Sequence, residues 1–185
     1  MTYSDAERRT LLGLARQAVA AEVSGAPAPR PDAVPPALQQ KRGCFVTLKN
    51  GDALRGCIGT FQPHLPLAEQ VVEMGVAAAR DPRFPMNRIR PEEVPELTVT
   101  VSVLSPLEPT DRPEQLEVGR HGIYVIRGAR AGCFLPEVAT EMGWTAEEFL
   151  DNCCAGKAGL PPGAWREPGT QVLLFTTETF SAGPI

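Results

Sequence analysis

The chain has 185 residues and a formal charge of −4 at pH 7, with 43% hydrophobic and 22% charged residues. These values are typical of one globular domain, or of a domain with a small second lobe, and argue against disorder throughout. No basic block occurs, which argues against nucleic acid as a partner. The N-terminus lacks a signal-peptide pattern and no apolar run could span a bilayer, so we predict a soluble, cytoplasmic protein with no membrane partner.

The N-terminal segment predicts one helix followed by an extended linker. Ser4 and Glu7 have the spacing of a helix capping box, and apolar residues then recur at helical intervals up to Val23. Gly25 is expected to end this helix. The stretch 26–36 contains five prolines, which favour a stiff, extended connection.

Two strand-like runs, 44–48 and 54–59, flank a strong hairpin signal at 49–52. A tight turn at Asn50-Gly51 would mix Arg55 and Cys57 with apolar residues on one face. A three-residue loop over 49–51, with Gly51 in the left-handed conformation, separates the two faces better. We therefore predict one face with Cys44, Val46, Leu48, Leu54, Gly56 and Ile58, and an outward face with Phe45, Thr47, Ala53, Arg55 and Cys57.

The rest of the sequence alternates helices and strands without a regular βαβ order. The apolar stripe of Val71, Val72, Val76 and Ala79 predicts a helix over 67–80 that Asp81-Pro82 ends. Further predicted elements are a helical turn at 91–94, strands at 97–103 and 171–176, a hairpin with strands at 123–126 and 133–135, and helices at 136–142 and from Thr145 onward. This pattern predicts an α+β fold with a mainly antiparallel sheet and flanking helices.

An ordered set of motifs gives the chain a resemblance to a known family. The segment Leu54-Arg55-Gly56-Cys57-Ile58-Gly59-Thr60 is the most distinctive of them. The others are the segments 45–48, 66–69, 81–84, 101–106, 134–139, 157–162 and 164–165. In this order, from about Thr10 to Phe180, the chain resembles the AMMECR family, called protein A of the AmmeMemoRadiSam system in prokaryotes.

The resemblance implies an α+β fold in a single domain over residues 1–185, with a larger part and a smaller lobe; the linker at 26–36 is richer in proline than expected for the family. It implies no established biochemical activity. Prokaryotic members are similar to proteins encoded beside a Memo-like protein and a radical SAM protein. This association implies a shared modification or small-molecule pathway, with those two proteins as expected partners.

Cys57 and Asp81 are the candidate catalytic residues. A Cys57 thiolate could act as a nucleophile or redox group, with Arg55 on the same face lowering its pKa. Asp81 could then orient a substrate or accept a proton. The alternative is that Cys57 is a small core residue, because neither His64 nor His121 has the context of a catalytic base.

The candidate binding residues are Arg55, Gly56, Ile58, Gly59 and Arg83. Arg55 in a short strand requires an anion or open solvent, since burying a lone charge is costly. Asp81 is its expected partner if the role is structural, and a small anionic ligand if it is functional. The two glycines would allow close approach of a substrate or a backbone. Two hypotheses remain open, an enzyme component acting through a cleft around Arg55 and Cys57, and a non-catalytic adaptor that docks a partner protein through the same patch.

No metal site or cofactor is predicted. Cys133 and the pair Cys153-Cys154 lack the C-x-x-C spacing of zinc ligands, so core packing is the favoured interpretation for them. Phosphate-binding loops, dinucleotide fingerprints and metalloprotease motifs do not occur.

Overall fold

Three strands with alternating apolar residues and one strand from the C-terminal end of the chain form the first of two four-stranded sheets. The structure is a computed structural model that describes residues 2–184. The strand order of this sheet is β2-β1-β3-β8, and β1 pairs antiparallel with both β2 and β3. Its strands are β1 (Cys44–Asn50), β2 (Ala53–Thr60), β3 (Leu97–Leu104) and β8 (Thr177–Ala182).

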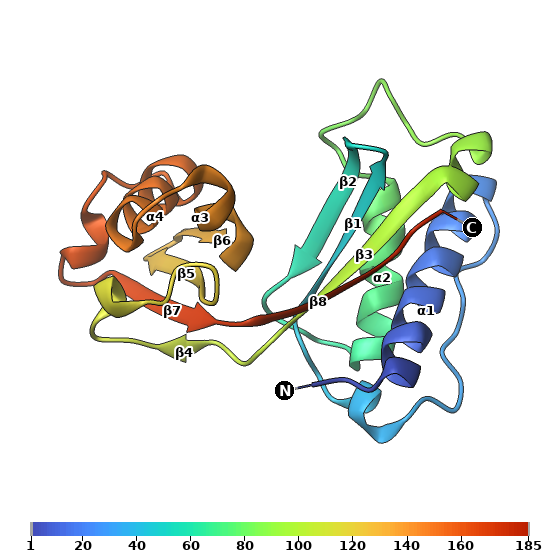
Figure 1. Ribbon diagram of the computed structural model, residues 1–185, viewed down its shortest axis with the longest axis horizontal. Coiled ribbons are helices and arrows are strands. Elements are labelled where there is room, and N and C mark those ends of the chain that lie inside the picture. The colour runs from blue at the N-terminus through green and yellow to red at the C-terminus, as the bar shows by residue number, and fades with distance from the viewer. Residues whose placement is uncertain (1, 185) are drawn as a thin grey trace. The chain divides into compact units, whose positions relative to one another are not determined.

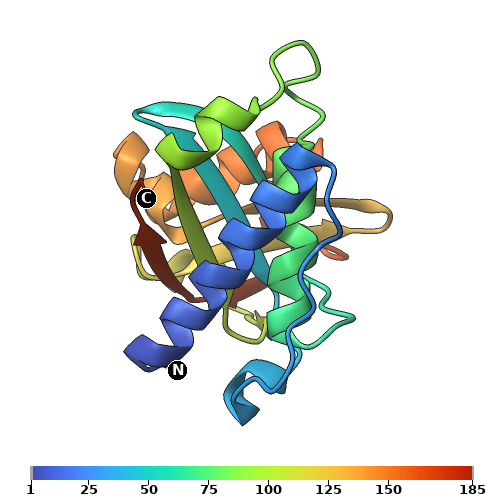
Figure 2. The ribbon, with the colours of Figure 1, turned by 90° about the vertical axis from the view of Figure 1, so that its right-hand side faces the viewer.

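Two long helices cover one face of this sheet (Figure 2). Helix α1 (Asp5–Ser24) begins with the predicted capping box, in which the Ser4 hydroxyl accepts from the Glu7 N–H and the Glu7 carboxylate accepts from the Ser4 N–H. It ends at Gly25, which has a φ of +73°. Helix α2 (Leu67–Ala79) ends just before Asp81-Pro82, as predicted. Short 3-10 turns, η1 (Pro36–Gln39) and η2 (Pro91–Glu96), complete this part.

The second sheet has the strand order β4-β7-β5-β6. Its strands are β4 (Glu108–Pro109), β5 (Gly122–Arg127), β6 (Arg130–Phe134) and β7 (Gln171–Phe175). Helices α3 (Pro136–Met142) and α4 (Ala146–Cys153) pack their apolar residues with those of the sheet, and α4 continues into the π-helical turn η4 (Cys154–Ala158). The 3-10 turns η3 (Pro113–Gln115) and η5 (Ala164–Arg166) belong to the same part.

The chain therefore divides into two compact units, labelled by their elements in Figure 1. The first unit contains the residues up to Leu104 and those from Glu178 onward, and the second unit spans Ser105–Thr177. Each unit has one four-stranded sheet with helices packed against it, and the pairs β1–β2, β1–β3, β4–β7, β5–β6 and β5–β7 are antiparallel. The predicted α+β class is confirmed.

The hairpin of β1 and β2 contains the predicted extra residue, but at a different place. Pairing of Asn50 with Ala53 leaves a two-residue tip in which Gly51 has a φ of +55°. Leu48 pairs with Gly56 and Lys49 with Leu54, so Arg55 is the bulged residue. The predicted three-residue loop is therefore wrong.

The shifted bulge changes the environment of two side chains. Leu54, predicted to face the core, is 36% exposed, and Arg55, predicted to face outward, is buried at 8% exposure. A bulge aims its extra residue away from the normal alternation, which is the physical reason. Beyond the bulge the predicted faces hold, because Ile58 pairs with Val46 and Cys57 with Thr47.

One further expectation needs correction, and two strands were not predicted. Val76 and Ala79 are half-buried rather than core residues of α2, whose buried side is formed by Leu67, Ala68, Gln70, Val71, Val72, Met74, Gly75 and Ala78. Strand β8 follows β7 directly and returns the chain to the first sheet, although its sequence, Thr-Glu-Thr-Phe-Ser-Ala, has little apolar alternation. The two-residue strand β4 is too short for a periodic signal.

Candidate functional site

The backbone of Cys57 lies on the outer edge of the sheet, where β2 has a neighbouring strand on one side only. Two side chains from the loop after α2 bond to this edge. The Cys57 N–H donates to Asp81 Oδ2 over 2.9 Å, and Arg83 Nη2 donates to the Cys57 carbonyl oxygen over 3.0 Å. Arg83 also pairs with Asp81, Nη2 to Oδ2 at 2.5 Å and Nε to Oδ1 at 3.0 Å. We call this arrangement the Asp81–Arg83 clamp.

The clamp determines the charge state of Asp81. Hydrogen bonds from the Arg83 side chain, together with the N–H groups of Cys57 and Arg83, hold the pKa of the Asp81 carboxyl at about 2, although burial opposes this shift. The pKa of Arg83 is raised by the same side-chain bond. A buried carboxylate with such a low pKa and with both oxygens bonded is poorly suited to accept a proton. These contacts favour a structural role for Asp81, and its predicted catalytic role stays a hypothesis.

Arg55 pairs with a residue that the sequence interpretation did not consider. Its Nε donates to Glu93 Oε2 over 3.0 Å, and its Nη2 donates to the Arg88 carbonyl oxygen over 3.4 Å. The side chains of Arg55 and Glu93 are 8% and 14% exposed, so the pair is largely withdrawn from water. The expected partner, Asp81, is bonded to Arg83 instead. An arginine within a strand indicates that an anionic partner is needed. No feature of the neighbouring sequence identifies Glu93 as that partner.

Three predicted binding residues of β2 lie against their own chain. A Cβ atom on Gly56 would lie 2.1 Å from the Ala78 carbonyl oxygen of α2, and one on Gly59 would lie 2.3 Å from the Phe45 ring. Ile58 packs against the core under the helices. Both glycines are therefore needed for packing inside the first unit, and these contacts give no support to ligand binding by the three residues.

The thiol of Cys57 is the remaining reactive group of the motif. It is half-buried on the sheet face that α1 and α2 do not cover, 3.1 Å from the hydroxyl oxygen of Thr47. The two histidines bond elsewhere, His64 with Glu73 and His121 with the Glu117 N–H. Among the described residues, Cys57 thus bonds to Thr47, Asp81 and Arg83 and not to a histidine base. Groups of three or more potential metal ligands do not occur in the described part of the chain.

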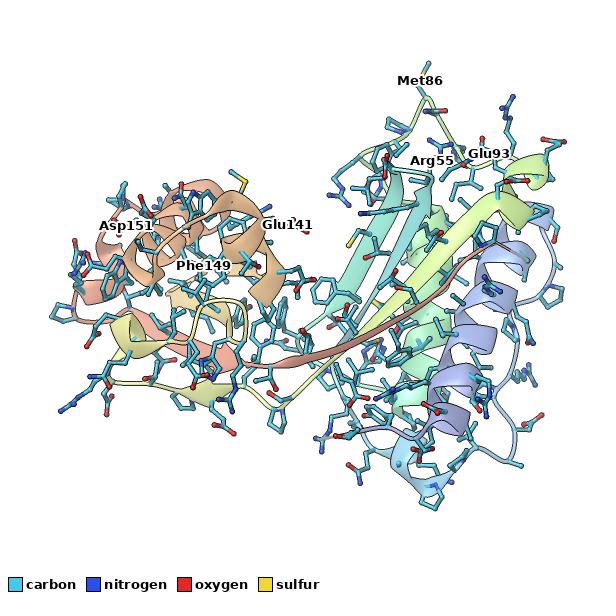
Figure 3. All side chains as sticks on the ribbon, viewed as in Figure 1. Arg55, Met86, Glu93, Glu141, Phe149 and Asp151 are labelled. Atoms are coloured by element: carbon cyan, nitrogen blue, oxygen red, sulfur yellow. The ribbon has the colours of Figure 1, made fainter. Side chains whose placement is uncertain are left out.

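A cavity of about 220 Å³ lies beside the bulge. Figure 3 shows Arg55 and Glu93 next to the loop that carries Met86. The cavity wall includes three arginines, Arg55, Arg80 and Arg88, and a single acid, Asp81; Cys57 is not part of it. The remaining lining residues are Ala79, Pro82, Phe84, Pro85, Asn87 and Ile89. We call this hollow the arginine cavity. The structure thus joins Arg55 and Asp81 in one cavity but leaves Cys57 outside it.

Comparisons with known proteins identify the family. The AMMECR1 family profile matches residues 12–180. The chain belongs to the AMMECR1 family. A protein from Methanothermobacter thermautotrophicus is 45% identical over 182 residues, which cover 94% of this chain and 93% of that protein. Protein MK0488 from Methanopyrus kandleri is 49% identical over 152 residues, with coverage of 77% and 72%.

A solved AMMECR1-type structure has the same fold. The crystal structure of the uncharacterized protein PH0010 from Pyrococcus horikoshii matches with a TM-score of 0.89 and 40% identity, covering 98% of this chain and 94% of that one. The predicted family resemblance is confirmed. The names of these AMMECR1 relatives state no activity, so a function has to be argued from the site. Within residues 2–184, no helix has the length and apolar character needed to cross a membrane.

Proposed function

We propose that this AMMECR1-family chain is a non-catalytic component that binds a small anionic molecule in the arginine cavity. The pathway would be a cytoplasmic modification or small-molecule pathway that includes Memo-like and radical SAM proteins. The pathway assignment is supported by the family resemblance alone. The binding assignment is supported by the charges of the cavity wall, and it can be tested separately.

Arg88 is the arginine of the cavity wall that carries the proposal, because Arg55 already pairs with Glu93 and Arg80 with Glu22. The negative charge of Asp81 is already compensated by Arg83, and that of Glu93 by Arg55 and Arg90. Arg88 has an exposed side chain, and no ion pair to it is found among the described residues. It can therefore reach a bound anion without breaking an existing pair. The volume corresponds to about seven water molecules, at roughly 30 Å³ each, which suits a phosphate or a small di- or tricarboxylate.

Titration with inorganic phosphate and with citrate, followed by calorimetry, tests this site. Substitution Arg88→Gln should weaken binding about 10-fold or more, since hydrogen bonds to charged groups contribute roughly 1.5–3 kcal/mol. Arg9→Gln is the matched control, because Arg9 is an exposed arginine on α1 and lies outside the cavity lining. Equal losses in the two variants, or no binding by the unaltered chain, would remove the arginine cavity as an anion site.

A second candidate function is docking of a partner protein through the same patch. Two large apolar side chains, Leu54 and Met86, are 36% and 97% exposed. Leu54 precedes the bulge, and Met86 lies in the loop that forms part of the cavity wall. Exposed apolar side chains next to a polar pocket are typical of interaction surfaces.

Co-purification with a Memo-like protein tests the docking function. Met86→Ser should reduce recovery of the complex at least 5-fold. Met142→Ser is the control, because Met142 is 58% exposed in the second unit. Unchanged recovery with Met86→Ser would exclude this surface as the interface with that partner.

A further inference from the structure

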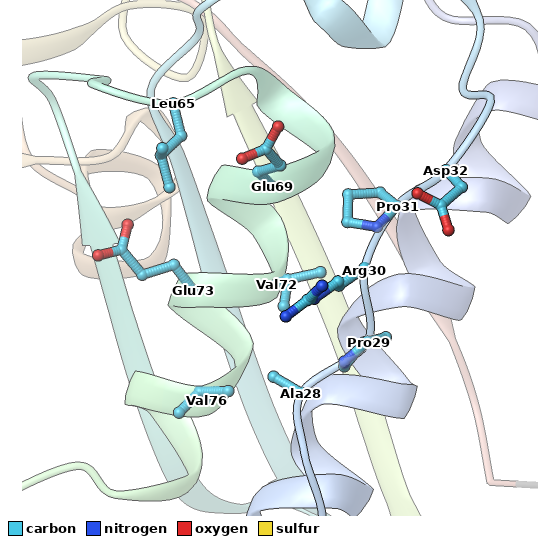
Figure 4. A pocket seen from close by; sticks show the side chains of 10 residues that line it. All are labelled: Ala28, Pro29, Arg30, Pro31, Asp32, Leu65, Glu69, Val72, Glu73 and Val76. Carbon is cyan, nitrogen blue, oxygen red and sulfur yellow. The ribbon is translucent and has the colours of Figure 1, made fainter.

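A larger hollow lies between the proline-rich linker and helix α2, away from the residues considered above. It has a volume of about 610 Å³, within the range of roughly 300–1,000 Å³ that is usual for small-molecule sites. Residues 28–32 form one wall, and Leu65, Val72 and Val76 form an apolar surface opposite (Figure 4). We call this hollow the linker groove.

The linker wall is stiff and fixed at both ends. Prolines at 27, 29 and 31 alternate with other residues and favour an extended backbone. Before the groove, the Ala26 N–H donates to the Ala21 carbonyl oxygen over 2.8 Å. After it, Leu38 is fully buried. A stiff segment held at two points cannot easily collapse onto α2, which keeps the groove open.

Backbone strain at one linker residue supports the same interpretation. Ala33 has a φ of +52° and is the one non-glycine residue with positive φ in the described part of the chain. Such a conformation costs roughly 1–2 kcal/mol for a residue with a Cβ atom. At Ala33 the backbone is therefore held by the attachments of the linker rather than by the preference of that residue.

The groove carries charges of both signs: the linker contributes Arg30 and Asp32, and α2 contributes Glu69 and Glu73. Glu69 and Glu73 lie one turn apart on α2, and Arg30 extends from the linker toward Val72 between them (Figure 4). Glu73 accepts a hydrogen bond from Gln70 Nε2 over 2.6 Å and pairs with His64 at 3.3 Å. Neither Glu69 nor Arg30 has a side-chain ion pair among the described residues.

A ligand with both charges could bridge these walls. A direct pair between exposed side chains would contribute only about 0–1 kcal/mol, so leaving Glu69 and Arg30 apart costs little. A molecule with an ammonium group for Glu69 and a carboxylate for Arg30 would satisfy both side chains at once. Its apolar body would cover Val72 and Val76, which also line the groove.

We propose that the linker groove binds a short peptide with free ends and apolar side chains. The N-terminal ammonium would pair with Glu69, supported by Glu73, and the C-terminal carboxylate would pair with Arg30. A single amino acid would leave much of the 610 Å³ unfilled, whereas a dipeptide with two large apolar side chains also reaches Leu65. This inference is independent of the anion site proposed above, because the two cavities share no lining residue.

Methyl NMR titration with the dipeptide Leu-Leu tests the proposal. Binding should shift the methyl resonances of Leu65, Val72 and Val76. Glu69→Gln and Arg30→Gln should each raise the dissociation constant about 5-fold or more. All of the substituted side chains are exposed, so the variants should keep the thermal midpoint of the unaltered chain.

Matched controls separate local contacts from general charge. Glu92→Gln and Arg9→Gln remove the same charges at exposed positions of the first unit outside the groove, and they should leave the dissociation constant unchanged. N-acetyl-Leu-Leu has no ammonium group, so it should bind the unaltered chain more weakly than Leu-Leu does. For the same reason, Glu69→Gln should weaken the binding of N-acetyl-Leu-Leu only slightly. Leu-Leu amide has no carboxylate, so it should also bind more weakly than Leu-Leu, and Arg30→Gln should weaken its binding only slightly.

Three results would overturn the proposal. The first is an absence of shifts in the groove methyls at millimolar Leu-Leu. The second is equal weakening by the groove variants and their controls. The third is undiminished binding of the acetylated, amidated dipeptide, which would show that the charged ends are not recognised.

Discussion

The two units are built alike but differ in what their interiors contain. Each has a four-stranded sheet, packed helices and a strand glycine pressed against helical backbone, Gly56 in the first unit and Gly132 in the second. Among the described residues, the buried polar or charged side chains are Arg55, Gln70, Asp81 and Ser102, all in the first unit. The second unit folds around apolar residues only. Buried charge is therefore not required by this kind of architecture, and in the first unit it gathers around β2.

The similarity of the two units is tested most strongly at the two glycines. A Cβ atom on Gly132 would lie 2.4 Å from the Ala158 backbone nitrogen, much as one on Gly56 would meet Ala78. We expect Gly56→Ala and Gly132→Ala each to destabilise their unit by at least about 3 kcal/mol, because backbone must move to make room. Hydrogen exchange measured by mass spectrometry should show lost protection in residues 2–104 for the first variant and in 105–177 for the second.

A third glycine provides the control for this experiment. A Cβ atom on Gly13 in α1 would meet nothing within 4 Å. Gly13→Ala should therefore stabilise the chain by about 0.5–1 kcal/mol through helix propensity. If Gly56→Ala and Gly132→Ala are as mild as this control, the close strand–helix contacts do not hold the units together.

The difference between the units is tested next at the Arg55–Glu93 pair. Arg55→Ala removes the buried partner of the largely buried Glu93 and leaves it only the exposed Arg90, so we expect a loss of about 3 kcal/mol in the free energy of unfolding. The comparison is Arg120→Ala in the second unit, where Arg120 and Glu117 are both more than half exposed. Arg120→Ala should change the free energy of unfolding by no more than about 0.5 kcal/mol, because exposed ion pairs contribute little to stability. Chemical denaturation measures the free energy of unfolding of both variants. Similar small losses in the two variants would contradict a special role of the buried pair in the first unit.

Acid sensitivity should also distinguish the first unit. The pKa of Asp81 in the folded chain is about 2, below the ordinary value of 3.8. A lowered folded pKa stabilises the protein above the ordinary pKa, here by about 2 kcal/mol, and this contribution is lost as the pH falls from about 4 to 2.

Asp81→Asn isolates this effect. The stability difference between the unaltered chain and the variant should be largest above pH 5 and should shrink steadily toward pH 2. Denaturation curves at several pH values measure it. A difference that does not change with pH would show that the clamp acts through shape rather than through charge.

The rates at which the five cysteines are alkylated give the last comparison, for which we expect the smallest effect. Burial raises the pKa of Cys44 to about 12 and also raises the pKa values of Cys153 and Cys154, so these three should alkylate slowly in the folded chain. Cys57 and Cys133 are half-buried and should label first. Site-resolved mass spectrometry compares these two. Labelling of Cys57 no faster than Cys133 would leave the nucleophile hypothesis without support.

Local signals predicted most of the fold. The capping box at Ser4, the alternation in β3 and the Asp81-Pro82 stop all act within a few residues of the element that they define. Strand β8 was not predicted, because its outward residues are polar and its pairing with β3 depends on residues far away in the chain. Between β3 and β8, side-chain hydroxyl groups bond to each other, such as those of Ser102 and Thr179, which are 3.0 Å apart. Such polar pairs leave no apolar pattern in the sequence of β8.

The candidate site was predicted only in part, for the same reason. The motif 55–59 and the segment 81–83 were recognised, and the structure brings them together through the clamp. The partner of Arg55 is Glu93, which is 38 residues away in the chain. The linker groove depends on how residues 28–32 pass over α2, and no pattern in either segment contains that information.

The Asp81–Arg83 clamp also bears on how copies of this chain avoid one another. An edge strand offers unpaired N–H and C=O groups on which a strand from another molecule can add, the first step of sheet-to-sheet aggregation. At Cys57 a carboxylate accepts the N–H and a guanidinium donates to the carbonyl, so two side chains occupy the positions that an incoming strand would need. The bonds that keep Asp81 ionised thus also close the middle of β2 to a foreign strand, and protonation of that one carboxylate would open it.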